Sequence, residues 1–169
     1  IIQLWSYMAA NHEMLLISEQ QIHEGALVVN VEDLSRFQLD PNHRLGIFAS
    51  MYSAMRKVIL PNRHIIIGDV SLLGDVRSNS RTYGHIINAL NCGARVLIIP
   101  GDIENKVQDL LGKKTVTIFT IDDLSEMGTL FNRLYFLNCI NRRQFESDRQ
   151  HPVEKLMQWH LACLNLYRK

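Results

Sequence analysis

The sequence predicts a mixed α/β (α+β) fold, a sheet with packed helices. Short runs rich in β-branched and aliphatic residues, at 64–72, 95–99 and 115–121, alternate with segments patterned as helices. Hydrophobic residues make up 47% and charged residues 21% of the chain, as in an average globular domain. Its 169 residues allow one domain with an appendage.

The first third of the chain predicts two helices and a strand. Residues 1–16 are expected to form a short helix, and residues 26–31 a strand. Asp40-Pro41-Asn42 predicts a turn that starts a helix, because Asp and Asn side chains cap free backbone amides. The helix over 43–57 is indicated by apolar residues at three- and four-residue steps, namely Leu45, Phe48, Met51, Tyr52 and Met55.

The middle of the chain predicts strands and helices in alternation. We expect one long strand or a strand pair over 64–72, and then a helix over 82–90 ended by Cys92-Gly93. A strand over 95–99, ended by Pro100-Gly101, and a short helix near 105–111 should follow. The last two elements are a strand over 115–121 and a helix from Asp122-Asp123 to about 136. This alternation is the basis of the α/β prediction.

The last stretch differs in charge from the rest. Residues 141–169 carry 6 basic and 3 acidic side chains, whereas residues 1–140 carry 12 and 14. Pro152 suits the first turn of a helix, and an apolar stripe follows it: Val153, Leu156, Met157, His160, Leu161, Leu164 and Tyr167. We expect this helix to dock on the core or on a neighbouring subunit. The predicted parts are an N-terminal helix and linker over 1–25, a domain over 26–137 and a basic helical extension over 138–169.

Composition excludes several classes of protein. No apolar run reaches the roughly 18 residues of a membrane span. The three cysteines, Cys92, Cys139 and Cys163, form no C-x-x-C pair, so neither a disulfide framework nor a zinc site is predicted, and we expect no metal and a reducing, cytoplasmic compartment. A net charge of +1 gives the whole chain no bulk attraction to nucleic acid. Because the chain begins with Ile1, we expect a piece of a longer protein.

One ordered set of residues resembles a known family. Residues 68–76 read Gly-Asp-Val-Ser-Leu-Leu-Gly-Asp-Val, and a predicted helix, a glycine and a strand ending in proline follow. This set is similar to the proteolytic domain of Lon-type ATP-dependent serine proteases, whose pattern is Gly-Glu-Ile-Thr-Leu-x-Gly-x-Val before a helix, a glycine and a strand ending in proline. The resemblance covers about residues 26–127. The matching positions are Gly68, Asp69, Gly74, Gly93 and Pro100.

The residues that carry catalysis in that family are absent here. The resemblance implies a serine nucleophile and a lysine base held neutral by burial. The serine position falls on Asn42 and the lysine position on Tyr83. An amide is not a nucleophile, and a phenol with a pKa near ~10 is a poor base at neutral pH. Two more polar positions of the family fall on Leu39 and Ile67. We therefore expect a Lon-like domain that has lost its dyad.

Other side chains near these positions are weaker candidates for chemistry. Ser53 and Lys57 lie four apart on one helix face, Ser71 lies within a strand, and Ser80 lies in a loop. None has an evident general base, so we expect structural or surface roles. A cluster of Tyr83, His85 and Arg81 would suit a phosphate or a carboxylate, although ordinary partly exposed side chains are expected there.

The resemblance also implies a function. Lon-like domains associate into hexameric rings, so a degenerate copy would serve as a ring-assembly scaffold and homo-oligomer. It is similar in kind to the non-proteolytic Lon-like parts of a RecA-type branch-migration protein and of AAA+ factors of BREX phage defence, which couple an ATPase to nucleic acid. This chain would bind no cofactor, and ATP and Mg²⁺ are expected only if an upstream ATPase domain exists. Candidate DNA or ligand contacts are Arg77, Arg81, His85, Arg142 and Arg143.

Two alternative functions follow from the same residues. One is an active Lon-type serine endopeptidase with an unusual site, which would use Ser50, Ser53, Ser71 or Ser80. The other is a monomeric module that binds a peptide in a groove between Asn42 and Tyr83.

Overall fold

A computed structural model of the chain describes residues 1–24, 40–58, 64–112 and 115–134. The chain divides into two compact units, Ile1–Asn132 and Arg133–Lys169. The strand predicted over 26–31 and the basic extension over 138–169, including Arg142 and Arg143, lie outside the described residues. In the described ranges no helix is both long enough and apolar enough to cross a membrane.

The N-terminal segment packs into the first unit. A helix is present as predicted, but α1 (Ile2–Ala10) is shorter than the expected 1–16, because the chain turns from Asn11 onward. Helix α1 buries Leu4 and Met8, and α2 (Glu19–Glu24) follows it. The Tyr7 ring meets Phe48 edge-on, with ring centroids 6.0 Å apart. The Gln21 amide donates to the backbone oxygen of Met55 across 2.8 Å. Residues 1–24 are therefore part of the core packing rather than a linker only.

The predicted turn and helix after residue 40 are confirmed. Asp40 caps the 3-10 turn η1 (Pro41–His43), because its carboxylate accepts from the backbone amide of Asn42. Helix α3 (Arg44–Arg56) continues from this turn and ends at Lys57, whose φ of 53° is left-handed. All five residues of the predicted apolar face are buried: Leu45, Phe48, Met51, Tyr52 and Met55.

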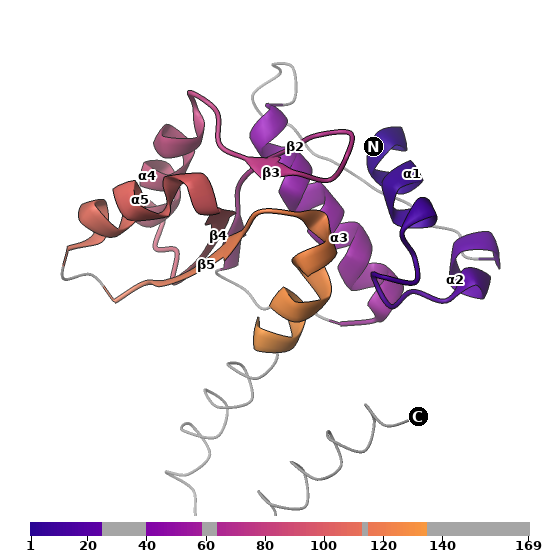
Figure 1. The fold of residues 1–169 in the computed structure, drawn as a ribbon. Helices are drawn as coiled ribbons and strands as arrows, with labels where there is room; N and C mark the ends of the chain where they lie inside the picture. Colours follow the sequence, from indigo (N-terminus) through magenta and orange to yellow (C-terminus); the bar gives the residue numbers. More distant parts are fainter. Residues whose placement is uncertain (25–39, 59–63, 113–114, 135–169) are drawn as a thin grey trace, which may run out of the picture. The chain divides into compact units, whose positions relative to one another are not determined.

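A parallel sheet of three strands confirms the α/β fold (Figure 1). Strands β1 (His64–Ile66), β4 (Val96–Pro100) and β5 (Thr117–Ile121) pair in the order β1-β4-β5. In the register, Ile98 of the central strand lies between Ile66 and Phe119. Parallel strands need long crossover connections, and helices α4 (Thr82–Asn91) and α5 (Glu104–Leu111) supply them.

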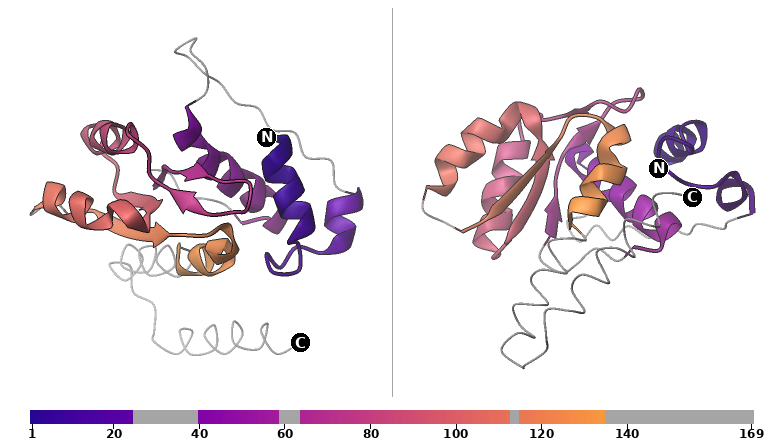
Figure 2. Two further views of the ribbon diagram at one scale, coloured as in Figure 1. Left: turned by 45° about the horizontal axis from the view of Figure 1, so that its top comes forward. Right: turned by 60° about the horizontal axis from the view of Figure 1, so that its bottom comes forward.

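Helices cover both faces of this sheet. Figures 1 and 2 show α4 and α5 on one face, and α3 with the helical stretch after η3 (Leu124–Glu126) on the other. Burial on both faces explains why β4 is continuously apolar. A short 3-10 turn, η2 (Gly101–Ile103), joins β4 to α5. The core under α4 and α5 comprises Ile67, Ile86, Ala94, Leu97, Ile99, Ile103, Val107 and Leu111.

The segment 64–72, predicted as one long strand or a strand pair, holds two separate strands, β1 and β2 (Asp69–Val70). Strand β2 does not continue the parallel sheet but forms a hairpin with β3 (Val76–Arg77). Gly68 lies at the break, and a Cβ there would stand 3.0 Å from Leu45. Gly74 closes the hairpin turn with a φ of +100°, and its Cβ would stand only 2.4 Å from the Tyr7 ring. Gly74 therefore requires glycine for both its backbone conformation and its space, whereas a side chain at Gly68 would need Leu45 to shift slightly.

Candidate functional site

The candidate site is a polar cluster around Asn42, between the start of α3 and the start of α4. Asn42 is fully buried. Its backbone amide and its side-chain amide both donate to Oδ1 of Asp40, across 2.9 and 2.7 Å. Its backbone oxygen accepts from the amide of Gly68 across 2.9 Å. The turn, the start of α3 and the end of β1 are thereby joined at one residue.

The loop before α4 supplies the rest of the cluster. The Asn42 amide donates to Oδ1 of Asn79 across 2.8 Å, and the Thr82 hydroxyl donates to Oδ1 of Asn42 across 2.5 Å. Asn79 also donates its backbone amide to the Thr82 hydroxyl, across 2.7 Å. This Asn79–Thr82 spacing resembles a capping box, in which residues three apart satisfy free amides at a helix start. Every hydrogen-bonding group of the Asn42 carboxamide thus has a partner within the chain.

Asp40 carries the negative charge of the cluster. Its Oδ2 lies 3.3 Å from the guanidinium of Arg81 and 3.3 Å from Nε2 of His85. Burial by itself would raise the pKa of Asp40, but the hydrogen bonds from Asn42, His85 and Arg81 outweigh it and hold the pKa well below its usual value. The His43 ring lies 5.6 Å from the His85 ring, centroid to centroid. Asp40 therefore stays ionised as the anchor of the cluster.

Tyr83, the predicted position of the lysine base, lies outside this cluster, and its neighbour Thr82 contacts Asn42 instead. Successive residues on an α-helix point about 100° apart. Because Thr82 faces Asn42, Tyr83 turns toward α5 and packs against the apolar core there. The Lys106 ammonium stands 4.5 Å above the Tyr83 ring. The phenol thus forms a cation–π contact.

The other predicted contact residues have neighbours of opposite charge. Arg77 is 73% exposed and lies 3.8 Å from Asp75. Arg81 and His85 both face Asp40, so the structure brings them together around a carboxylate of the chain itself. Asp69 pairs with Arg44 across 3.1 Å.

The remaining glycine and proline positions of the motif have structural roles. Gly93 follows the end of α4 with a φ of +85°, as predicted for a helix stop. Pro100 ends β4 and stands 3.2 Å from where a Cβ of Gly68 would be.

Three of the four candidate serine nucleophiles, Ser50, Ser53 and Ser71, donate to backbone or carboxylate oxygens. Ser50 donates to the backbone oxygen of Gly46 across 2.8 Å, and Ser53 donates to that of Val58. Ser71 donates to Asp75 across 2.9 Å in the hairpin turn, and Ser80 is exposed. A carboxylate beside Ser71 accepts its proton as a hydrogen bond, but nothing in that pair orients a base as a serine hydrolase requires.

Sequence reasoning missed three members of the cluster. Asp40 was expected only as a turn residue, and Asn79 and Thr82 were not singled out. The available signals were the Asn-x-x-Thr spacing before the predicted helix and the aspartate two residues before Asn42. Neither signal places 40–42 beside 79–82, because that contact depends on the tertiary fold.

Comparisons with known proteins leave the Lon-type resemblance as a prediction. No family model matches the sequence, and no curated protein matches it significantly. In the described ranges, no group of three or more His, Cys, Asp or Glu side chains is arranged to hold a metal ion.

Proposed function

We propose that this chain is a catalytically inactive Lon-like domain that serves as an assembly scaffold for an ATP-dependent protein of AAA+ or RecA type. One observation carries the proposal. Asn42, at the position of the family's nucleophile, is fully buried, and its carboxamide is fully hydrogen-bonded to Asp40, Asn79 and Thr82. A substrate carbonyl has no access to this position, and the side chain there has no nucleophilic atom.

The cluster has a structural function that supports a scaffold. It ties the turn before α3 to the loop before α4, two segments about 40 residues apart in sequence. Satisfied buried polar networks specify one arrangement of the backbone, because breaking any member leaves a desolvated group. A surface built on these segments would therefore be rigid enough for repeated assembly.

The proposed contact with nucleic acid rests on fewer residues than the proposed scaffold role. All three candidates have an acidic neighbour, Asp75 for Arg77 and Asp40 for Arg81 and His85, but the two arginines are mostly exposed and so stay within reach of a phosphate. If an ATPase domain precedes this chain in the full protein, that domain would hold ATP and Mg²⁺. The exposed free thiol of Cys92 fits the reducing, cytoplasmic compartment expected from the cysteines.

The peptide-binding alternative fits the described residues less well. It needs a groove between Asn42 and Tyr83, yet Asn42 is fully buried and Thr82 lies against it. A peptide would have to displace the cluster to reach Asn42, at the cost of several buried hydrogen bonds.

Sedimentation velocity over a hundredfold range of concentration tests the scaffold proposal. We expect a mass that is a multiple of the 19.5 kDa chain, with a hexamer as the form that the resemblance implies. A mass of one chain at every concentration would overturn assembly and favour the monomeric module.

A further inference from the structure

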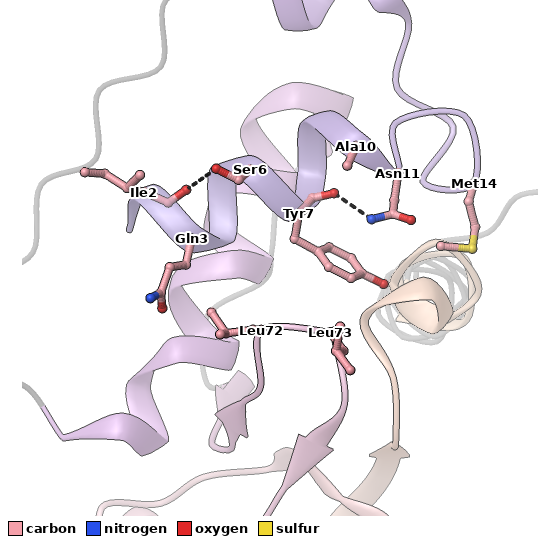
Figure 3. Close-up of a pocket in the computed structure, with 9 residues that line it drawn as sticks. All are labelled: Ile2, Gln3, Ser6, Tyr7, Ala10, Asn11, Met14, Leu72 and Leu73. Atoms are coloured by element: carbon pink, nitrogen blue, oxygen red, sulfur yellow. Dashed lines mark hydrogen bonds between the residues drawn. The ribbon is translucent and has the colours of Figure 1, made fainter.

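The hollow between α1 and the turn of the β2–β3 hairpin is lined mainly by side chains that are apolar or already bonded (Figure 3). It has a volume of about 650 Å³. Ser6 and Asn11 donate to the backbone of α1, and the Tyr7 hydroxyl donates to Asp123. The side chains that can exchange protons with a ligand lie instead around Asp40, at the polar cluster.

This cluster lies at the carboxyl end of strand β1. The backbone oxygen of Asn42 accepts from the amide of Gly68, and β1 ends two residues earlier, at Ile66. The loop before α4 reaches the same end of the strand, because Asn79 bonds to Asn42. In open α/β sheets, ligands bind in the crevice outside the carboxyl ends of the parallel strands. The cluster therefore occupies the part of the fold that ordinarily carries a site.

Two histidines and an arginine form the outer side of the cluster. Arg81 is 76% exposed, His85 is 34% exposed, and His43 is also exposed. The centroids of the two imidazole rings lie 5.6 Å apart, so both rings can reach oxygens of one phosphate group. We call these three side chains the His–Arg face.

Asp40 positions one of the two imidazoles. Its Oδ2 lies 3.3 Å from Nε2 of His85, and an ionised carboxylate can only accept a hydrogen bond. Nε2 therefore carries the ring proton, and Nδ1 of His85 is left with a free electron pair. A buried carboxylate that fixes the tautomer of a neighbouring imidazole is the arrangement that orients a histidine as a general base.

The composition of the His–Arg face suits transfer of a phosphoryl group. Imidazole is the side chain that both takes and gives protons near neutral pH, so two of them can serve as base and acid. A guanidinium binds phosphate oxygens through paired hydrogen bonds and offsets the charge that develops on them. These three groups lack only a nucleophile, which a substrate can supply.

RNA is the substrate that brings its own nucleophile, because a 2′-hydroxyl lies beside each phosphodiester. An open face also suits a polymer, since small ligands are usually held in concave pockets that bury most of their surface. Arg77, at the end of β3, is 73% exposed and can contact a neighbouring phosphate of the same strand.

We propose that the His–Arg face cleaves RNA by transesterification. Nδ1 of His85 takes the proton of a 2′-hydroxyl, the 2′-oxygen forms a bond to phosphorus, and the bond from phosphorus to the 5′-oxygen breaks. A protonated His43 gives its proton to the 5′-oxygen. The products are a 2′,3′-cyclic phosphate and a 5′-hydroxyl, and exchange of protons with water restores both rings. Arg81 binds the phosphate oxygens throughout.

This reaction is different from peptide hydrolysis, and it does not depend on the Lon-like assignment or on assembly. It requires only the side chains of the His–Arg face and the carboxylate behind them. Asp40 is a positioning residue in this reaction, because it acts through His85.

The test uses a DNA oligonucleotide that contains a single ribonucleotide, with EDTA present to inhibit metal-dependent nucleases. We expect the full chain to cut only after the ribonucleotide and mass spectrometry to find a cyclic phosphate. His85→Gln keeps an amide that can donate to Asp40, and His43→Gln changes an exposed side chain, so both should fold. Each should lower the cleavage rate at least about a hundredfold. His23→Gln, an exposed histidine of α2, is the matched control and should cleave like the wild type.

Three results would overturn the inference. The first is no cleavage by the wild type at any pH between about 5 and 8, where imidazole changes its charge. The second is equal cleavage by the wild type and the His43 and His85 variants. The third is equal cleavage of an all-DNA oligonucleotide, because DNA has no 2′-hydroxyl. None of these results changes the sedimentation test of the scaffold proposal, so the two proposals can fail separately.

Discussion

Thr82 donates its hydroxyl proton to the carboxamide oxygen of Asn42 across 2.5 Å, and both side chains are fully buried. This bond joins the first residue of α4 to the turn before α3. In the Lon-like assignment that we propose, this turn is the one that would carry the nucleophile. Here a neutral hydrogen bond between the Asn42 amide and the Thr82 hydroxyl holds the two helix starts together. The role of these two side chains is therefore structural.

Replacing Thr82 with valine should destabilise the fold by about 1–3 kcal/mol, because it leaves the Asn42 oxygen and the Asn79 amide without a partner in a buried site. Valine keeps the shape of threonine, so little packing is lost. Urea unfolding followed by circular dichroism measures the change. Thr117→Val, at an exposed position of β5, is the matched control and should shift stability by less than about 0.5 kcal/mol. Equal effects of the two substitutions would refute a special role for Thr82.

Asp40→Asn should weaken the fold by about 1.5–3 kcal/mol at pH 7, since hydrogen bonds to a charged group are lost and an amide cannot accept from all the same donors. The loss should depend on pH. The folded pKa of Asp40 lies below the unfolded value, so the wild type gains this stability fully above the unfolded pKa of about 4.

As the pH falls, the unfolded chain takes up the proton before the folded one does, so the stabilisation shrinks as the pH approaches the folded pKa. The difference in urea midpoint between wild type and Asp40→Asn should therefore be larger at pH 7 than at pH 3. A difference that is the same at both values would show that the Asp40 charge does not anchor the cluster.

Gly74→Ala should cost about 2 kcal/mol or more, because alanine is strained at a φ of +100° and its Cβ would run into the Tyr7 ring. Gly84→Ala is the natural contrast. It lies inside α4 with open space around it, so alanine should stabilise the fold by about 0.5–1 kcal/mol through helix propensity. Thermal melts of the two variants beside the wild type give the comparison. A stabilising Gly74→Ala would mean that the turn does not have this conformation.

Most of the fold in the described ranges could be predicted from the spacing of apolar residues and from the residues that end helices and strands. The helix over 43–57 followed from its apolar spacing, and the stop at Cys92-Gly93 followed from the left-handed conformation that glycine accepts. The strand over 95–99 followed from its aliphatic run. These are local properties, and each depends on residues within one element.

The composition of the site could be predicted only in part. Asp40 and Asn42 were recognisable as a turn, but their contact with 79–82 depends on two segments far apart in sequence. Tyr83 shows that the sequence also does not fix which of two neighbouring helix residues faces the site. A pattern match is uncertain by one residue, and one residue on a helix changes the direction of the side chain by about 100°. Thr82, rather than Tyr83, therefore faces Asn42.

Hydrolysis of a dye-labelled unfolded protein by the full chain tests the central claim most directly, because the proposed Lon-like assignment places the nucleophile position on Asn42, which is buried, fully hydrogen-bonded and not nucleophilic. The assay compares the wild type with Ser71→Ala and Ser80→Ala. We predict that all three release no dye above the background of a buffer control. Dye release by the wild type that is lost in either serine variant would contradict an inactive domain and would identify that serine as the nucleophile.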